Sequence, residues 1–226
     1  MDNIPKKFLS LVINKELRDI FYEYSEIAID CILDDENMER IPIVSTLTKG
    51  GKVVLSFRDR IFIKKVGRFL SEAENINPAL IEKYYAELES DDAKYKVGEA
   101  LLTMLDRIDD EEKARIVGYF FTKRVQGELS ESWFRIMTNA IEKIYITDIH
   151  TLRNGYKNPC ILENQIGEIF VPYRIIDRKV KLISAFRNLQ VDGESLGEND
   201  IKVEYSLSNL GRKFVKYLNE YSNKKF

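Results

Sequence analysis

Apolar residues recur at three- and four-residue steps from Pro5 to about Leu33. This spacing places them on one face of an α-helix, so the segment is predicted to be helical. Asn14 interrupts the pattern and is expected to divide the helix into two pieces. The apolar positions are Leu9, Ile13, Leu17, Ile20, Phe21, Ile27, Cys31 and Ile32.

The same spacing predicts five more helices before residue 154. Asn77 and Pro78 mark one start clearly, because Asn is a good N-cap and Pro fits the first helical turn. Between the first helix and these five, Pro42 disfavours helix at Ile41, and Gly50-Gly51 predicts a loop. The five helices are Phe57 to Ala73, Pro78 to about Glu89, Asp92 to Ile108, Asp109 to Val125, and Ser130 to about Leu152. The last is predicted to bury Phe134, Met137, Ile141, Ile144, Tyr145 and Ile149.

The pattern changes after two turn signals, Asn154-Gly155 and Asn158-Pro159. The segment Ile166 to Ile176 is rich in β-branched and aromatic residues, and strand and helix both remain open for it. Asp177 is a candidate cap for a helix from Arg178 to Leu189. Short strands near 189–191 and 201–207 are predicted next, joined by the polar turn DGESLGEND, and a helix from Ser208 to about Tyr221 follows.

These elements predict a mainly α protein. Residues 1–154 are expected to form a multi-helix bundle. Residues 155–226 are expected to form a winged-helix-like domain with a β-hairpin and a final helix.

Composition narrows the functional classes. The 226 residues are 44% hydrophobic, and 35 basic against 37 acidic residues give a net charge of −2. This balance argues against a dedicated nucleic-acid binder, which usually has a basic excess. Two cysteines without CxxC spacing indicate a reduced, cytoplasmic protein. The sequence lacks a signal peptide and any apolar run long enough for a transmembrane helix.

Candidate metal chemistry is weak. The acidic run from Asp106 to Lys113 lacks the Gly and Glu that a calcium-binding EF-hand loop needs at its sixth and twelfth positions. Asp109 and Glu112 instead fit a capping box at a helix start. His150 is the only histidine and is interpreted as structural. No metal or other cofactor is therefore predicted.

Asp177 and Lys179 resemble the D-x-K end of a metal-dependent nuclease, for which Glu163 or Glu168 would supply the earlier carboxylate. That interpretation requires Asp177 to lie on a strand. Chance explains so short a motif better, so the nuclease is kept only as a second alternative.

One helix carries a basic stripe, which comprises Arg58, Arg60, Lys64, Lys65 and Arg68. On a helical wheel these cations lie opposite an apolar arc that includes Phe62, Val66 and Phe69. A basic face of this kind can contact anionic lipid, an acidic partner or nucleic-acid phosphate. The alternative is an ordinary solvated face paired with neighbouring acids.

A winged helix often binds DNA, and the predicted helix after Asp177 carries a candidate nucleic-acid surface. Its residues are Arg178, Lys179, Lys181 and Arg187. The predicted wing, however, carries Asp192, Glu194, Glu198 and Asp200, which a phosphate backbone would repel. Packing or protein contact is therefore favoured over DNA binding for this domain.

Several motifs together resemble a poorly characterised bacterial family. They are FRDRIFIKKVGRFL, LLTMLDRIDDEEKARIVGYFF, GELSESWFRIM and the C-terminal YSLSNLGRKF. The helical middle is similar to tellurium-resistance-type domains, and the tail is similar to proteins associated with abortive infection. The acidic metal-site residues of tellurium-resistance domains have no equivalent set here.

Together these features predict a non-enzymatic cytoplasmic interaction or regulatory module in phage defence or stress response. Its partner is expected to be a protein or a second copy of the chain. A peripheral contact with an anionic membrane is also open, nucleic acid is less favoured, and no small-molecule substrate is evident. The main alternative is a winged-helix DNA-binding regulator.

Overall fold

The computed structural model describes residues 4–27, 57–73, 76–157, 164–183 and 200–223. They form two compact units, Met1–Ile146 and Thr147–Phe226. The predicted boundary after residue 154 lies inside a helix of the second unit. The architecture is mainly helical, with a C-terminal two-stranded hairpin and a final helix, and this confirms the predicted fold class.

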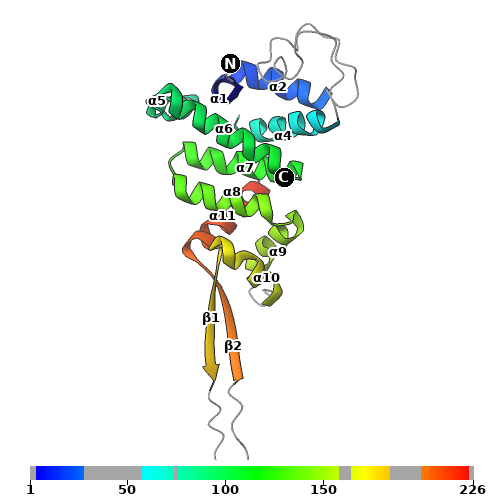
Figure 1. Cartoon of the computed structure of the whole chain (residues 1–226), viewed down its shortest axis with the longest axis vertical. Helices are drawn as coiled ribbons and strands as arrows, with labels where there is room; N and C mark the ends of the chain where they lie inside the picture. The colour runs from blue at the N-terminus through cyan, green and yellow to red at the C-terminus, as the bar shows by residue number, and fades with distance from the viewer. Residues whose placement is uncertain (1–3, 28–56, 74–75, 158–163, 184–199, 224–226) are drawn as a thin grey trace, which may run out of the picture. The chain divides into compact units, whose positions relative to one another are not determined.

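The first unit is a helical bundle (Figure 1). Its helices are α1 (Ile4–Ile13), α2 (Lys15–Ile27), α4 (Phe57–Ala73), α5 (Pro78–Glu87), α6 (Asp91–Arg107), α7 (Glu111–Val125) and α8 (Glu131–Lys143). The predicted break at Asn14 is confirmed: its side-chain Oδ1 accepts a hydrogen bond from the Leu17 amide at 3.1 Å. The predicted start at Asn77 and Pro78 is also confirmed, since Asn77 Oδ1 accepts from the Ala79 amide at 3.0 Å. The predictions for Ile41 and for Gly50-Gly51 lie outside the described residues.

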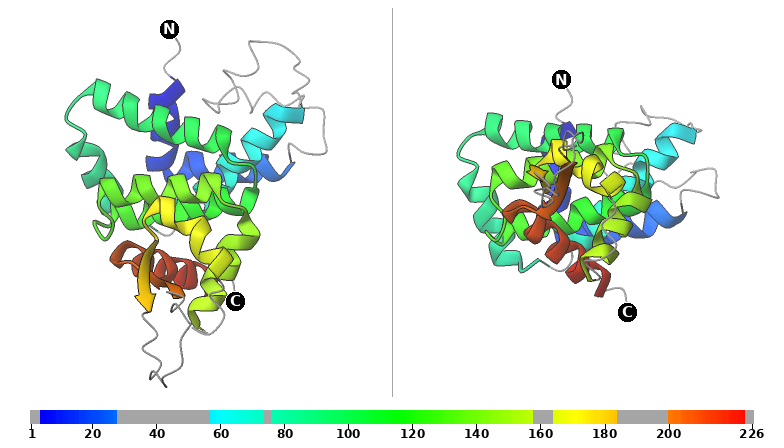
Figure 2. Two further views of the ribbon diagram at one scale, coloured as in Figure 1. Left: turned by 60° about the horizontal axis from the view of Figure 1, so that its bottom comes forward. Right: turned by 90° about the horizontal axis from the view of Figure 1, so that it is seen from below.

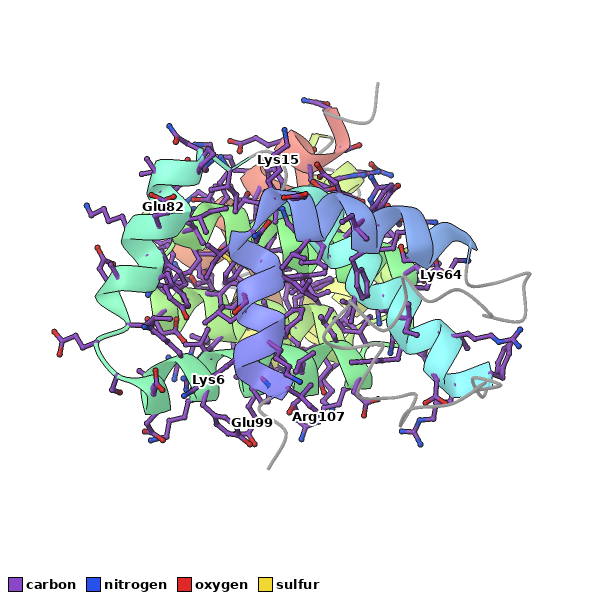
Figure 3. All side chains as sticks on the ribbon, turned by 90° about the horizontal axis from the view of Figure 1, so that it is seen from above. Lys6, Lys15, Lys64, Glu82, Glu99 and Arg107 are labelled. Carbon is purple, nitrogen blue, oxygen red and sulfur yellow. The ribbon has the colours of Figure 1, made fainter. Side chains whose placement is uncertain are left out.

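Helix α7 is the centre of this unit. It lies between α4 and α8 and packs against both (Figure 1). Most of its side chains are buried. Gly118 lets α4 approach closely, because a Cβ at this position would lie 2.5 Å from the carbonyl oxygen of Phe69. Helix α1 packs on α6 in the same way at Gly98, and Figure 3 labels Lys6 and Glu99 at one end of this pair.

A chain of aromatic contacts crosses the core. Ring centroids lie 5.9 Å apart for Phe8 and Phe69, 5.5 Å for Phe69 and Phe121, and 6.2 Å for Phe121 and Phe134. The rings of Tyr84 of α5 and Phe121 are nearly perpendicular, with their centroids 5.8 Å apart. The chain connects α1, α4, α7 and α8, and it fixes the positions of Tyr84, Phe121 and Phe134.

The helix predicted from Ser130 to Leu152 is in fact two helices, so that prediction was wrong. Helix α8 ends at Lys143, and Ile144 has an extended backbone with φ −93° and ψ 141°. A new helix, α9, covers Ile146–Lys157. Tyr145, predicted to be buried, is 72% exposed because it lies at this break. The turn predicted at Asn154-Gly155 is instead helical within α9.

The second unit contains α10 (Asn164–Phe170), a 3-10 turn (Val171–Tyr173), strands β1 (Ile176–Ile183) and β2 (Asp200–Leu207), and α11 (Asn209–Asn223). The segment from Ile166 to Ile176, for which both strand and helix were predicted as alternatives, is therefore mostly helical. The predicted second strand is confirmed, and so is the last helix. Ser208 caps that helix: its Oγ accepts from the Gly211 amide at 2.9 Å. Figure 2 shows β1 continuing from α10 in yellow, with α11 in red.

The helix predicted from Arg178 to Leu189 was wrong over residues 178–183, and its remainder lies outside the described residues. Residues 176–183 form β1, which pairs antiparallel with β2 in a register that joins Ile176 to Leu207 and Lys179 to Glu204. Side chains alternate with a period of two along the strand, with Ile176, Arg178 and Val180 on one face and Asp177, Lys179 and Lys181 on the other. The strand predicted near 189–191 lies outside the described residues.

Candidate functional site

The basic stripe is largely paired with acids of neighbouring helices. Lys64 Nζ lies 2.9 Å from Glu111 Oε1, and Arg68 Nε lies 3.2 Å from Glu111 Oε2. Arg58, the most exposed of the set, lies 3.8 Å from Asp106, and Arg60 also interacts with neighbouring groups. The stripe is therefore mainly the paired outer face of α4.

The placement of Lys65 on this outer face was wrong. Its side chain is buried, with a residue exposure of 5%, and Nζ donates to the carbonyl oxygens of Asp106 at 3.0 Å and Ile108 at 2.7 Å. Burial is the main cause that lowers the pKa of Lys65. Lys65 thus satisfies the carbonyls at the C-terminal end of α6, where a cation is favoured.

The acidic run between α6 and α7 is a helix start, but the predicted cap was one residue off. Asp110 is the N-cap, and its Oδ1 accepts from the amides of Glu112 at 2.7 Å and Lys113 at 3.3 Å. Asp109 instead pairs with the buried Lys113 at 2.6 Å. Within the described ranges, no three His, Cys, Asp or Glu side chains gather as metal ligands.

The candidate nucleic-acid surface lies on a strand rather than on a recognition helix. Arg178 Nε pairs with Glu168 Oε1 at 3.2 Å, and Lys181 Nζ pairs with Glu204 Oε2 at 2.6 Å. Lys179 lies opposite Glu204 in the register, and Arg187 lies outside the described residues.

The candidate nuclease residues, Asp177 and Lys179 with Glu168, do not lie together. Asp177 does lie on a strand, as that interpretation required, and it shares a face with Lys179. Glu168, however, contacts Arg178 and the hydroxyl of Tyr205, which belong to the opposite face of the hairpin. Glu163 lies outside the described residues. His150 is half-buried on α9 and interacts with neighbouring groups.

A cavity of about 300 Å³ lies between α6 and α8, and we call it the α6–α8 cleft. One wall is a face of α6 and the other is a face of α8, with residues that recur at helical spacing. The α6 wall consists of Lys96, Val97, Ala100, Leu101 and Met104. The α8 wall consists of Glu131, Phe134, Arg135, Thr138, Asn139 and Glu142.

The floor of the cleft is aromatic. Tyr84 of α5 and Phe121 of α7 form it, and Phe134 of α8 adjoins them. All three are buried in the aromatic chain of the core. Burial is the main cause that raises the pKa of Tyr84, so this phenol remains neutral at physiological pH. The cleft therefore offers an apolar, rigidly positioned base.

The rim of the cleft carries paired charges. Glu131 accepts from Arg135 Nε at 2.8 Å and from Arg124 Nε at 3.1 Å. On α6, Lys96 pairs with Asp92 at 2.6 Å. These rim groups neutralise one another within the protein, so they shape the opening without giving it a strong net charge.

Glu142 differs from the rim acids because its side chain is only 9% exposed. Lys143 Nζ lies 2.7 Å from its Oε1, but that oxygen accepts no hydrogen bond within the described part of the chain. A carboxylate removed from water normally needs both an opposite charge and hydrogen bonds. Glu142 therefore provides a polar group in a mainly apolar cleft.

The pairing of Glu131 gives a testable pH dependence. Burial alone raises the pKa of Glu131, but the hydrogen bonds from Arg135 and Arg124 outweigh it and hold the pKa below its ordinary value of 4.5. A carboxyl group whose pKa is lower in the folded state than in the unfolded state stabilises the fold at pH values above its unfolded-state pKa. This stabilisation is lost as the pH falls through its folded-state pKa. We expect Glu131→Gln to lower the free energy of unfolding at pH 7 by about 0.5 to 1 kcal/mol, given the half-exposed side chain.

Urea denaturation at a series of pH values measures this effect. The difference between wild type and Glu131→Gln is expected to shrink below pH 4.5, as the wild-type carboxylate becomes protonated. Glu99→Gln, an exposed change on α6 outside the cleft, serves as the control. A difference for Glu131→Gln that stays constant down to acidic pH would contradict the assignment.

The sequence contained a partial signal for the cleft. Phe134 was predicted to face inward, and it is buried at the α8 wall. Val97 of the α6 wall is half-exposed because it lines the opening. The contributions of Tyr84, Ala100 and Glu142 were missed, because they depend on how α5, α6 and α8 are placed around α7.

Among the helices of the described residues, none combines the length and apolar character needed to cross a bilayer. Comparisons of the chain with protein-family models, with curated proteins and with solved structures found no match.

Proposed function

We propose that the protein is a non-enzymatic interaction module that binds an amphipathic helix of a partner protein in the α6–α8 cleft. The observation that carries this proposal is the cleft itself, in which two helix faces oppose each other over the aromatic floor of Tyr84 and Phe121. Pockets of this type, mainly apolar with a few placed polar groups, are common binding sites. Helices often bind in such grooves through residues on one face.

The dimensions of the cleft fit a short helix. The α8 wall extends from Glu131 to Glu142, and the α6 wall from Lys96 to Met104. At about 1.5 Å per helical residue these walls are roughly 16 Å and 12 Å long. Apolar anchors at positions i, i+3 or i+4, and i+7 of a bound helix span about 10 Å, so two or three anchors fit between the walls.

The other candidate surfaces support their alternatives less well. Lys65 is buried and Lys64 and Arg68 pair with Glu111, so the basic stripe offers few cations to a membrane. Arg178 and Lys181 pair with Glu168 and Glu204, which weakens the nucleic-acid alternative. A cytoplasmic role in phage defence or stress response is part of the proposal and rests on the family resemblance.

Selection from a library of amphipathic helical peptides tests the proposal. We expect peptides with Kd values on the order of micromolar for the full-length protein, as measured by fluorescence anisotropy. Ala100 is exposed on the α6 wall, so Ala100→Trp would fill the cleft without replacing a core side chain. This variant is expected to weaken binding by at least about ten-fold, because the anchors lose their space.

Thr103→Trp is the matched control, because Thr103 is exposed on the same helix but does not line the cleft. It is expected to leave the affinity unchanged. The proposal is wrong if no selected peptide binds, or if Ala100→Trp and Thr103→Trp have the same effect on every peptide.

A further inference from the structure

The two glutamates on the α8 wall of the α6–α8 cleft differ in how they are paired. At the Glu131 end, two arginines supply hydrogen bonds to the carboxylate. At the Glu142 end, the carboxylate is more deeply buried, and among the described residues its ion pair is with Lys143. The two glutamates are separated by three helical turns, so a ligand meets them as separate groups.

The environment of Glu142 favours a ligand that brings a cation. Its Oε1 accepts no hydrogen bond among the described residues, and Lys143, which supplies the nearby charge, is 55% exposed. Hydrogen bonds between charged groups are stronger than those between neutral groups, particularly away from water. An ammonium or guanidinium group in the cleft would give Glu142 the hydrogen bonds that Lys143 does not.

The apolar part of the ligand would lie on the aromatic floor. Tyr84, Phe121 and Phe134 present ring surfaces next to the α8 wall. Aliphatic stems of Lys and Arg pack well on apolar surface while the charged head reaches a polar partner. Aromatic rings also attract cations through their faces.

We infer that the α6–α8 cleft recognises a basic residue of the bound helix, a Lys or Arg whose cationic head pairs with Glu142 and whose stem lies on the aromatic floor. This inference rests on the proposed function and adds the determinant of specificity. It assigns Glu142 as the residue that distinguishes a basic helix from a purely apolar one.

Two small probes test the chemistry without a peptide. Phenethylammonium combines an apolar ring with a cation, and 2-phenylethanol is its neutral counterpart. Each is titrated into the full-length protein and followed by ¹H–¹⁵N NMR. Phenethylammonium is expected to bind about ten-fold more tightly, because only it adds the attraction between opposite charges to its hydrogen bond with the Glu142 carboxylate. Glu142→Gln is expected to remove this preference, with a much smaller change for 2-phenylethanol than for phenethylammonium, while Glu99→Gln preserves the preference.

The peptides selected above provide the second arm. We expect the selected peptides to carry a Lys or Arg at a fixed spacing from the apolar anchors. Replacing this residue by norleucine is expected to weaken peptide binding to the wild-type protein about ten-fold. The same replacement is expected to leave peptide binding to the Glu142→Gln variant unchanged. Equal binding of both probes to the wild-type cleft would overturn the inference while leaving the proposed function standing. Binding of phenethylammonium at Glu142 without any helical binder would overturn the proposed function and indicate a small-amine site.

Discussion

Replacing Gly118 with alanine is expected to lower the free energy of unfolding by about 2 to 3 kcal/mol. In an exposed helix this change would stabilise by about 1 kcal/mol, because alanine has the higher helix propensity. At Gly118 the sign reverses, since the added Cβ would lie 2.5 Å from the Phe69 carbonyl oxygen and force α4 away from α7. Urea denaturation monitored by circular dichroism measures the change.

Gly67 offers a matched comparison within the same unit. A Cβ there meets the side chain of Ser25, with Oγ at 2.2 Å and Cβ at 2.7 Å, rather than a backbone carbonyl. We therefore expect Ser25→Gly to recover much of the stability that Gly67→Ala loses. No truncation of the Phe69 side chain removes its carbonyl, so the Gly118→Ala loss has no such rescue. A stabilising Gly118→Ala change would show that α4 and α7 are not in close contact.

Lys65→Met is expected to cost about 2 to 4 kcal/mol of unfolding free energy. The methionine retains most of the apolar stem, but the carbonyls of Asp106 and Ile108 lose their donor. A buried acceptor such as the Ile108 carbonyl costs about 1 to 3 kcal/mol when left unsatisfied, and the part-buried Asp106 carbonyl adds a smaller loss. The loss is concentrated at the connection between α6 and α7, and equilibrium urea denaturation of the full-length protein measures it.

Lys64→Met is the control for this change, because the two lysines are neighbours on α4. Lys64 pairs with Glu111 at 2.9 Å while partly exposed, and such pairs contribute about 0 to 1 kcal/mol. The assignment of Lys65 fails if the two variants are equally stable.

The sequence predicted helices well where local signals agreed. The limits of α4 were predicted correctly from its apolar spacing, and the start of α5 followed from Asn77 and Pro78. Both depend on neighbours within a few residues. The strand β1 was missed because Arg178 interrupts its apolar face, and because pairing with β2 is a long-range effect.

The candidate site was harder to predict for the same reason. A helical wheel placed Lys65 outside, since it treats every cation as solvated. The wheel contains no information about the α6 carbonyls that Lys65 reaches. The cleft likewise depends on how α6 and α8 are placed around α7, whose Phe121 packs against Phe134 of α8.

The register of the β1–β2 hairpin constrains how its length can vary between related chains. Arg178 and Tyr205 are paired, and both contact Glu168 of α10. Because side chains alternate with a period of two, inserting one residue into either strand near its base would turn every later side chain to the other face. Two residues added to each strand would keep both faces. Length differences within the paired strands of orthologous chains are therefore expected in even steps, with the contacts to Glu168 retained.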